Sequence, residues 1–323
     1  MTADVILHLA KPDLAGYRGK ESAGIYPAIW DVLHPRGARL RIAERSAEQM
    51  QGRPLEGDGN LHIVETGFCS GPGWFCAATA YLPGFWHLSD RGVLADSPAR
   101  EATFDPVQVP WKLAKQFDRD LRKRFVSARV SRYRQEKLPT EILPEGALAV
   151  FLQGPAVYRR HQAFVSAKEM LRAIAQSADG RDVVVKAHPL AKPLGQEVIA
   201  AVRAEGFDLI ETHANVHDIL ASCAATLSVN SAVALEGFLH RKPAILFGRS
   251  DFHQLAETVV RLSDLPSTLG RALSRDWDFA KMLYWYFSAH SLQVAAPMFP
   301  ERLLQLFDNA GFGPDRLGLA RQG

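Results

Sequence analysis

The second half of the sequence alternates short apolar segments with amphipathic ones, and this pattern constrains the fold more than any other feature. β-branched and other apolar residues fill 147–152, 182–187, 225–229 and 243–247. Between them, apolar residues recur at helical spacing. Strands that are apolar throughout and separated by helices are typical of a parallel sheet covered on both faces. The sequence therefore predicts a doubly wound α/β domain in this half.

The first half predicts a second α/β domain by a weaker form of the same pattern. Apolar segments at 5–9, 39–43 and 61–65 are expected to form parallel strands, with a helix at 25–33 after the first. Residues 69–106 are rich in glycine, proline and aromatic residues, which favours loops with short strands.

The predicted domains are separated by a long helix over 109–135 and a proline-punctuated linker at 138–146. The end of the chain is expected to be helical, at 276–290 and 300–309. The predicted organisation therefore has three parts, which are an N-terminal domain (1–140), a C-terminal domain (141–290) and a helical tail (291–323).

Composition excludes several classes of protein. The 323 residues carry a formal charge of +3, and no basic stripe dominates, so we expect no nucleic-acid partner. The densest basic stretch, 119–134, is either the solvated face of a helix or a contact for acidic lipid headgroups. Three cysteines (Cys69, Cys76, Cys223) form no CxxC pair, which favours a reducing compartment. With no signal peptide or spanning segment in the pattern, we expect a cytoplasmic protein.

Common catalytic motifs are missing from the sequence. It contains no phosphate-loop, nucleophile-elbow, HExxH or GxGxxG pattern. His213 and His217 are four residues apart, but Asn215 and Asp218 indicate that a helix begins between them. We therefore predict no metal site.

The first positive signal is VVVKAHPLAK at 183–192. A buried strand ends there by delivering Lys186 and His188, followed by Pro189, to its carboxyl edge, where open α/β sheets bind ligands. A cation and an imidazole donor suit a phosphate. The alternative is that His188 orders the loop and Lys186 is solvated.

The second signal is LSVNSAVALEGFLHRKPAILFG at 227–248. Asn230 and Ser231 follow a strand and are favoured N-cap residues, so they predict an anion site at the start of a helix. Glu236 suits the hydroxyls of a ribose, or alternatively an ion pair with the basic residues at 241–242. Gly248 ends the next strand, where backbone can approach a ligand.

The third signal is HIVETGFCSGPG at 62–73. Glu65 ends a strand and Gly67 permits a tight turn. A carboxylate at such an edge is a candidate general base for an acceptor hydroxyl. The alternative is a glutamate that only orders the loop.

In this order, the three segments resemble the bacterial capsule polysaccharide biosynthesis family, whose characterised members are β-Kdo transferases that use CMP-Kdo to build a lipid-linked primer. The likeness covers roughly residues 60–290. The residues that match the family pattern are Glu65, Gly67, Gly92, Ser97, Leu152, Gln153, Lys186, His188, Pro189, Ser231, Glu236, Lys242, Pro243 and Gly248.

The resemblance implies a GT-B-like architecture, with two Rossmann-like domains facing a central cleft and C-terminal helices. The C-terminal domain would hold the nucleotide sugar and the N-terminal domain would face the acceptor. His188 and Ser231 would contact the CMP phosphate, Glu236 would lie near the nucleotide, and Glu65 would belong to the catalytic loop.

From the residues and the resemblance together, we expect a glycosyltransferase that transfers Kdo from CMP-Kdo to a glycan or lipid-linked acceptor. The CMP-sugar is its donor substrate, and no separate cofactor is expected. The expected catalytic residues are Glu65 and His188. The expected nucleotide-binding residues are Lys186, His188, Pro189, Asn230, Ser231, Glu236 and Gly248. Peripheral association with the inner membrane stays open.

Two departures from the family pattern keep other functions open. Thr66 stands where the family commonly has aspartate, and 154–161 lacks an expected carboxylate. The alternatives are a UDP- or GDP-sugar donor, or a non-catalytic relative that binds a glycan or a partner in polysaccharide export.

Overall fold

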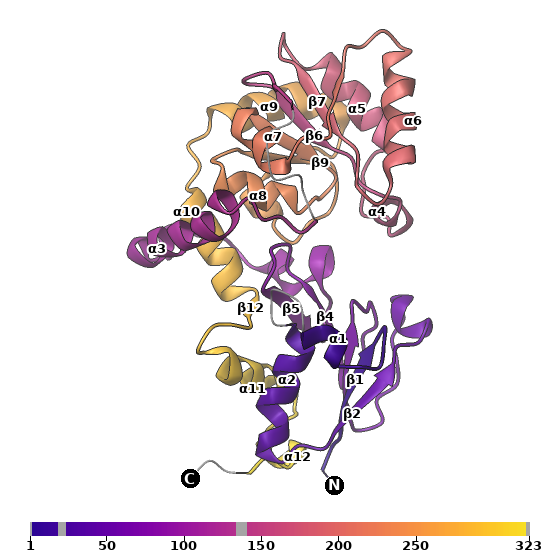
Figure 1. Ribbon diagram of the computed structural model, residues 1–323, viewed down its shortest axis with the longest axis vertical. Coiled ribbons are helices and arrows are strands. Elements are labelled where there is room, and N and C mark those ends of the chain that lie inside the picture. The colour runs from indigo at the N-terminus through magenta and orange to yellow at the C-terminus, as the bar shows by residue number, and fades with distance from the viewer. Residues whose placement is uncertain (1, 19–23, 134–140, 321–323) are drawn as a thin grey trace. The chain divides into compact units, whose positions relative to one another are not determined.

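The computed structural model describes residues 2–18, 24–133 and 141–320. The chain forms two compact units, one made of Met1–Glu101 with Tyr286–Gly323 and the other of Ala102–Trp285. Each contains a six-stranded sheet flanked by helices (Figure 1). The predicted fold class, α/β with two Rossmann-like domains, is confirmed. In the described ranges, no helix is both long and apolar enough to span a bilayer.

The sheet of the first unit has the order β12-β5-β4-β3-β1-β2. Strands β1 to β4 run parallel where they pair, and β5 and β12 are antiparallel to their neighbours. Its strands are β1 (Val5–Leu9), β2 (Leu40–Glu44), β3 (Leu61–Glu65), β4 (Trp74–Thr79), β5 (Phe85–Ser89) and β12 (Leu292–Gln293). The strands expected at 5–9 and 61–65 are confirmed residue for residue.

One face of this sheet is covered by helices and the other by loops. Helices α2 (Ile25–Leu33) and α11 (Phe299–Asn309) bury their apolar residues on the first face, together with the short α12 (Pro314–Leu317). Phe307 of α11 meets Phe75 of β4 edge-on. The short α1 (Ala15–Arg18) precedes α2.

The sheet of the second unit has the order β11-β10-β9-β6-β7-β8, and all of its pairings are parallel. The strands are β6 (Leu148–Phe151), β7 (Val183–Lys186), β8 (Ile210–Glu211), β9 (Ala225–Ser228), β10 (Ala244–Leu246) and β11 (Glu257–Thr258). The doubly wound domain predicted from the alternation is therefore confirmed.

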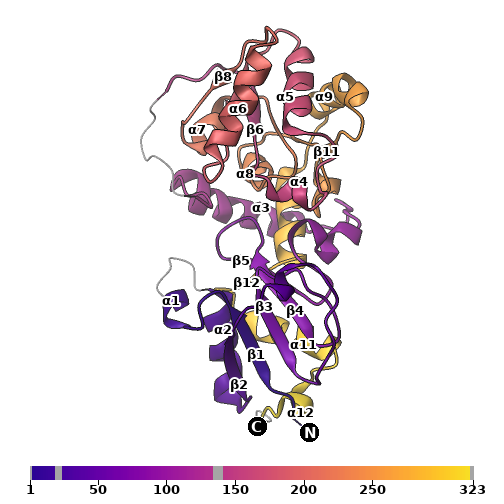
Figure 2. The same cartoon turned by 90° about the vertical axis from the view of Figure 1, so that its right-hand side faces the viewer.

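Helices cover both faces of the second sheet, which explains why its strands are apolar throughout. Helices α5 (Ala167–Gln176), α6 (Lys192–Arg203) and α9 (Leu265–Ser274) pack on one face (Figure 2). Helix α7 (Val216–Ser222) packs on the other face, and α8 (Val233–Leu239) follows β9. The remaining helices are α3 (Trp111–Leu121), α4 (Ala156–Arg159) and α10 (Phe279–Tyr284).

The contacts divide the chain at 101/102 and 285/286, whereas the sequence suggested 140 and 290. Helix α3 belongs to the second unit because it packs beside α10 (Figure 1). Arg241 also pairs with buried Asp118 of α3, and Arg122 donates to the carbonyl of Leu239 at 2.6 Å. The end of the chain belongs to the first unit because β12 pairs with β5.

The helix expected over 109–135 ends earlier. Helix α3 stops at Leu121, a π-helical turn follows over Arg122–Ser127, and Arg129 has a φ of 52°. A left-handed residue cannot continue the helix. The last residues of that prediction, 134–135, lie outside the described ranges.

Candidate functional site

Four of the residues that match the family pattern share one edge of the second unit's sheet. Because the strands are parallel, their carboxyl ends meet at the same edge, which is where open α/β sheets bind ligands. His188 follows β7, Gln153 follows β6, Ser231 follows β9 and Gly248 follows β10.

His188 offers an N–H donor at this edge. Its Nδ1 accepts a hydrogen bond from the backbone N–H of Leu190 at 3.2 Å. In the neutral ring the proton therefore sits on Nε2. Burial lowers the pKa of His188, and the nearby charge of Arg132 lowers it further. The ring is thus neutral near pH 7 and can donate through Nε2.

Glu236 is a buried carboxyl group with one oxygen that has no partner among the described residues. It is 1% exposed, and its Oε1 accepts from the hydroxyl of Ser131 at 2.9 Å. Its Oε2 is buried and has no hydrogen-bond partner among the described residues. Burial raises the pKa of Glu236 to about 7. The alternative ion pair with Arg241 does not form, because that guanidinium pairs with Asp118.

The segment 129–133 is anchored to the helices of the second unit. Arg129 makes two bonds to the carboxylate of Asp218, at 2.7 and 2.8 Å. The Nε2 of His217 donates to the carbonyl of Val130 at 3.0 Å. These contacts fix the segment on α7 directly before it reaches Glu236.

This segment touches both His188 and Glu236. Ser131 donates to Glu236, and the ring of Tyr133 lies edge-on to the ring of His188 with centroids 5.3 Å apart. Arg132 lies between Ser131 and Tyr133 in the sequence. Its side chain is exposed and makes no hydrogen bond or ion pair within the described part of the chain. Its charge acts on the pKa of His188 and of Glu236. His188 and Glu236, which are 48 residues apart in sequence, thus both contact the segment 131–133.

Sequence reasoning missed Ser131, Arg132 and Tyr133. The helical spacing of the preceding residues continues into them, so they were assigned to the solvated face of a helix. The left-handed turn at Arg129, which redirects the chain, has no signal in residue type because glycine or asparagine usually occupies such a position.

The ammonium group of Lys186 bonds to the backbone of the loop that follows the neighbouring strand. Its Nζ donates to the carbonyls of His213 and Ala214 at 3.2 and 2.5 Å. Burial lowers the pKa of its ammonium. Lys186 therefore holds the loop between β8 and α7 and keeps one N–H for other partners. Pro189 is exposed beyond the strand end.

Asn230 ties strand ends together. Its side chain accepts from Gln153 at 2.9 Å, and its Nδ2 donates to Gln162 at 3.2 Å and to the carbonyl of Arg249 at 2.8 Å. Its backbone N–H donates to Gln153 at 2.8 Å. Both amide hydrogens are therefore used within the protein.

Ser231 does not cap α8 as expected. The N-cap position is Ala232, which has no side chain that could accept a hydrogen bond. The Oγ of Ser231 instead accepts from the N–H of Val233 at 3.3 Å. Since this bond uses only an oxygen lone pair, the hydroxyl hydrogen is left to donate.

Gly248 is explained by packing against the chain. A Cβ at this position would lie 2.5 Å from a methyl carbon of Val229 and 2.6 Å from the carbonyl oxygen of Gln162. Gly248 also forms an isolated antiparallel bridge with Ala163. The close approach that requires glycine is therefore to protein backbone and side chain.

Glu65, the remaining predicted residue, lies in the first unit. Its Oε2 accepts from the N–H of Ala10 and the hydroxyl of Tyr17, both at 2.6 Å. Burial raises the pKa of Tyr17 to about 12, and the bond to Glu65 adds to this. Thr66 follows with a φ of 50°, a strained conformation for a β-branched residue. Glu65 is thus held by one oxygen, and its Oε1 makes no hydrogen bond in the described ranges.

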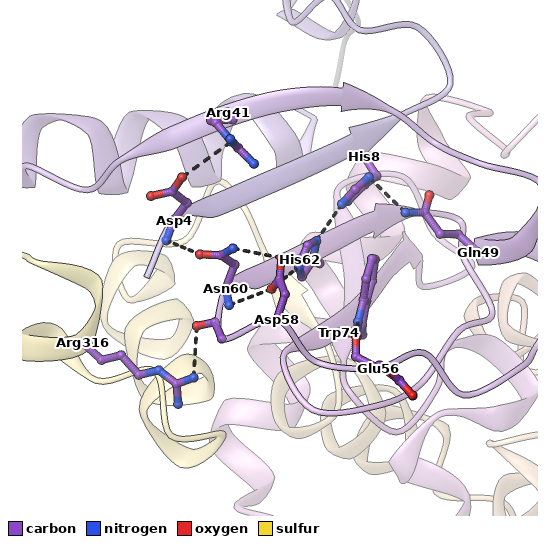
Figure 3. Close-up of polar contacts among 11 residues, drawn as sticks. Asp4, His8, Arg41, Gln49, Glu56, Asp58, Asn60, His62, Trp74 and Arg316 are labelled. Atoms are coloured by element: carbon purple, nitrogen blue, oxygen red, sulfur yellow. Dashed lines mark hydrogen bonds and ion pairs between the residues drawn. The ribbon is translucent and has the colours of Figure 1, made fainter. Parts of the chain in front are cut away.

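The first unit also contains a chain of polar contacts that the sequence did not suggest, with Gln49, His8 and His62 buried and Asp58 exposed (Figure 3). Gln49 donates to Nδ1 of His8 at 3.0 Å, so His8 carries its proton on Nε2. That nitrogen lies 2.9 Å from Nδ1 of His62, whose Nε2 lies 2.9 Å from Asp58. Trp74 stacks on His62 with centroids 3.8 Å apart. All four imidazole nitrogens of His8 and His62 have partners within the protein, so none is left for a ligand.

Two solved structures from Thermosulfurimonas dismutans are similar in fold. The KpsC β-Kdo 2,7 transferase is 10% identical, covers 96% of this chain and 99% of its own, and has a TM-score of 0.53. The KpsC β-Kdo 2,4 transferase is 14% identical, covers 88% and 90%, and has a TM-score of 0.52. At this identity, the likeness shows the shared fold. No curated protein matches the sequence significantly.

The sequence itself carries a family signature in the second unit. Residues 156–255 match the family described as capsule polysaccharide biosynthesis protein. This range contains His188, Ser231 and Glu236, and it ends just before β11. The resemblance predicted from the sequence is therefore confirmed, and through residues 156–255 the chain carries the pattern of the capsule polysaccharide biosynthesis family.

Proposed function

We propose that the chain is a glycosyltransferase of surface or capsular polysaccharide biosynthesis that takes Kdo from CMP-Kdo. The observation that carries the proposal is the meeting of His188 and Glu236 with the segment 131–133 at the carboxyl edge of the second sheet. The family match and the shared fold support the same reaction class. The acceptor is a glycan or a lipid-linked glycan.

In this proposal, three donors face the phosphate of the departing CMP. These are Nε2–H of His188, the guanidinium of Arg132 and the hydroxyl of Ser231. Fixed donors stabilise the charge that grows on a leaving group more than on the intact substrate. Lys186 acts mainly by holding the loop beside them, and Asn230 by holding the strand ends.

Glu236 binds the ribose. Its unpartnered Oε2 is a hydrogen-bond acceptor that the protein leaves empty. A ribose hydroxyl would satisfy this oxygen and recover part of the cost of burying it.

Glu65 orients or deprotonates the acceptor hydroxyl. The two hydrogen bonds to Oε2 hold the carboxyl group in place, and Oε1 remains for the acceptor. A lipid-linked acceptor would bring the protein to the surface of the inner membrane.

The first test removes the imidazole. His188→Ala should slow CMP release from CMP-Kdo, with a Kdo-bearing glycolipid as acceptor, by about a hundredfold or more. His213→Ala is the matched control, because this histidine follows the neighbouring strand and is exposed. Full activity in His188→Ala would remove this residue from the proposed site.

The second test identifies the donor. Thermal unfolding with CMP, UMP, UDP and GDP should show the largest stabilisation with CMP, about 2.7 kcal/mol at a hundred times the dissociation constant. A larger effect of UDP or GDP would replace the CMP-sugar by another donor. No effect of any nucleotide, and no CMP release, would indicate a non-catalytic relative.

A further inference from the structure

The first unit contains a cavity of about 510 Å³ that the proposed transfer site does not use. We call it the α11 cavity. Its walls come from β5 and β12 on the sheet side, from α11, and from the 3₁₀ turns at 94–101. All of its lining residues belong to the first unit. Its volume lies in the usual range for small-molecule sites.

Helix α11 lines this cavity with a polar stripe. Arg302, Gln305 and Asn309 are spaced three and four residues apart, so they lie on one face of the helix. The Nε2 of Gln305 donates to Oδ1 of Asn309 at 2.8 Å. The side-chain oxygen of Gln305 and the side-chain amide hydrogens of Asn309 are left for other partners. The apolar residues of α11 pack on the sheet, and Gln305 and Asn309 are exposed, so this stripe is the polar side of the helix where it borders the cavity.

Arg302 is a partly buried cation without an anion. Within the described ranges it forms no ion pair, and its hydrogen bond to the carbonyl of Ala289 is long, at 3.4 Å. Burial lowers the pKa of its guanidinium, and no carboxylate offsets this. The other lining arginine, Arg91, pairs with Glu101 at 3.1 Å. Arg302 is therefore the lining guanidinium that is open to an incoming negative group.

The opposite wall suits the body of a sugar. Trp86 and Leu88 of β5 give it an aromatic and an apolar surface. The indole N–H of Trp86 is buried and has no hydrogen-bond partner in the part of the chain described. The hydroxyl of Ser89 and the exposed carboxylate of Asp90 add groups that can bond to sugar hydroxyls.

We propose that the α11 cavity binds a saccharide that carries a single negative group, a carboxylate or a phosphate, with Arg302 on that group. The aromatic wall takes the ring, and the amides of Gln305 and Asn309 take hydroxyls. This inference does not rest on the proposed transferase activity, because it uses residues of the first unit alone.

The test uses the full-length protein and three probes: glucuronate, glucose 6-phosphate and uncharged glucose. Isothermal titration should show saturable binding of at least one charged sugar and at least tenfold weaker binding of glucose. Arg302→Gln should weaken the charged sugar at least tenfold, and Arg302→Lys should restore part of the affinity. Arg53→Gln, at an exposed arginine outside the cavity, should change nothing. The stronger of the two charged probes identifies the anionic group.

A second measurement does not depend on Arg302 variants folding. In the unsubstituted protein, the indole N–H resonance of Trp86, assigned with Trp86→Phe, should shift as the charged sugar is added. Trp111, which is exposed and belongs to the second unit, serves as the internal reference. The proposal is overturned if neither charged sugar binds, or if binding leaves the Trp86 resonance in place. His188→Ala should leave this binding unchanged, which separates the outcome from that of the transferase assay.

Discussion

Both units bury ionisable side chains against a sheet, but they treat them differently. In the first unit, the chain from Gln49 through His8 and His62 to Asp58 uses all of the imidazole nitrogens (Figure 3). In the second unit, Glu236 has one bonded oxygen and one without a partner among the described residues. A buried polar group is normally paired, so an unpaired one needs a reason.

The difference teaches where to look for a ligand. The two histidines make their hydrogen bonds within the protein, so neither ring has a nitrogen left to bind a ligand. Burying the ionised carboxylate of Glu236 without a donor for Oε2 costs free energy, and a bound ligand could offset that cost. The raised pKa of Glu236 reflects the same cost of burial. The comparison therefore favours a structural role for the first cluster and supports the binding role proposed for Glu236.

The largest expected effect on stability comes from breaking the chain of contacts through His8 and His62. His62→Ala removes a buried ring, its stacking on Trp74, and the partners of His8 and Asp58. We expect a loss of about 4 kcal/mol in the free energy of unfolding by urea at pH 7.5. His34→Ala, at an exposed histidine, should cost under about 0.5 kcal/mol. A loss below about 1 kcal/mol in His62→Ala would show that the chain contributes little to stability.

The next effect is a dependence on pH. Burial, helped by the neighbouring His62, lowers the pKa of His8 to about 4, from an ordinary value of 6.5. The unfolded chain accepts this proton more readily than the folded protein does. The stabilisation is therefore complete above pH 6.5 and is lost as the pH falls from 6.5 to 4, by about 3 kcal/mol. Urea unfolding across this window should show that slope, and His8→Leu should flatten it. An equal slope in the variant would contradict the assignment.

The smallest effect has the opposite sign. The pKa of Glu236 is about 7, against an ordinary 4.5, so its contribution to stability is complete below pH 4.5 and is lost as the pH rises to 7. Glu236→Gln avoids burying that charge. We expect it to be about 2 kcal/mol more stable than the parent at pH 8, after the cost of a buried amide N–H, and no more stable at pH 4.5.

The same variant separates binding from structure. If Glu236 serves the ribose, Glu236→Gln should bind CMP more weakly while unfolding at higher urea. If nucleotide affinity is unchanged, the open oxygen has no part in recognition. Ser131→Ala is the companion variant, because it removes the only hydrogen bond that the carboxyl group of Glu236 makes in the described ranges.

Most of the fold could be predicted, because it depends on local pattern. Strands β1 and β3 and helix α2 have the expected bounds. The errors fall where distant contacts decide. Helix α3 joins the second unit through Arg241, which is 123 residues away from its partner Asp118, and no local periodicity contains that information.

The site could be predicted only as far as its strand ends. Position after a buried strand placed His188 and Ser231 at the right edge of the sheet. The partners that decide each role are remote in sequence, such as Gln153 for Asn230, 77 residues apart, and Ser131 for Glu236, 105 residues apart. The histidine chain was invisible for the same reason, since His8 and His62 are 54 residues apart.

The first unit is assembled from both ends of the chain, and this has a consequence for biosynthesis. Its sheet begins at Val5, but β12 and the covering helix α11 are translated after residue 285. All of 102–285 emerges from the ribosome before those last elements do. The second unit can therefore complete its core during translation. The apolar face of the first sheet stays exposed until α11 packs on it, so this face is the part that a chaperone would have to shield.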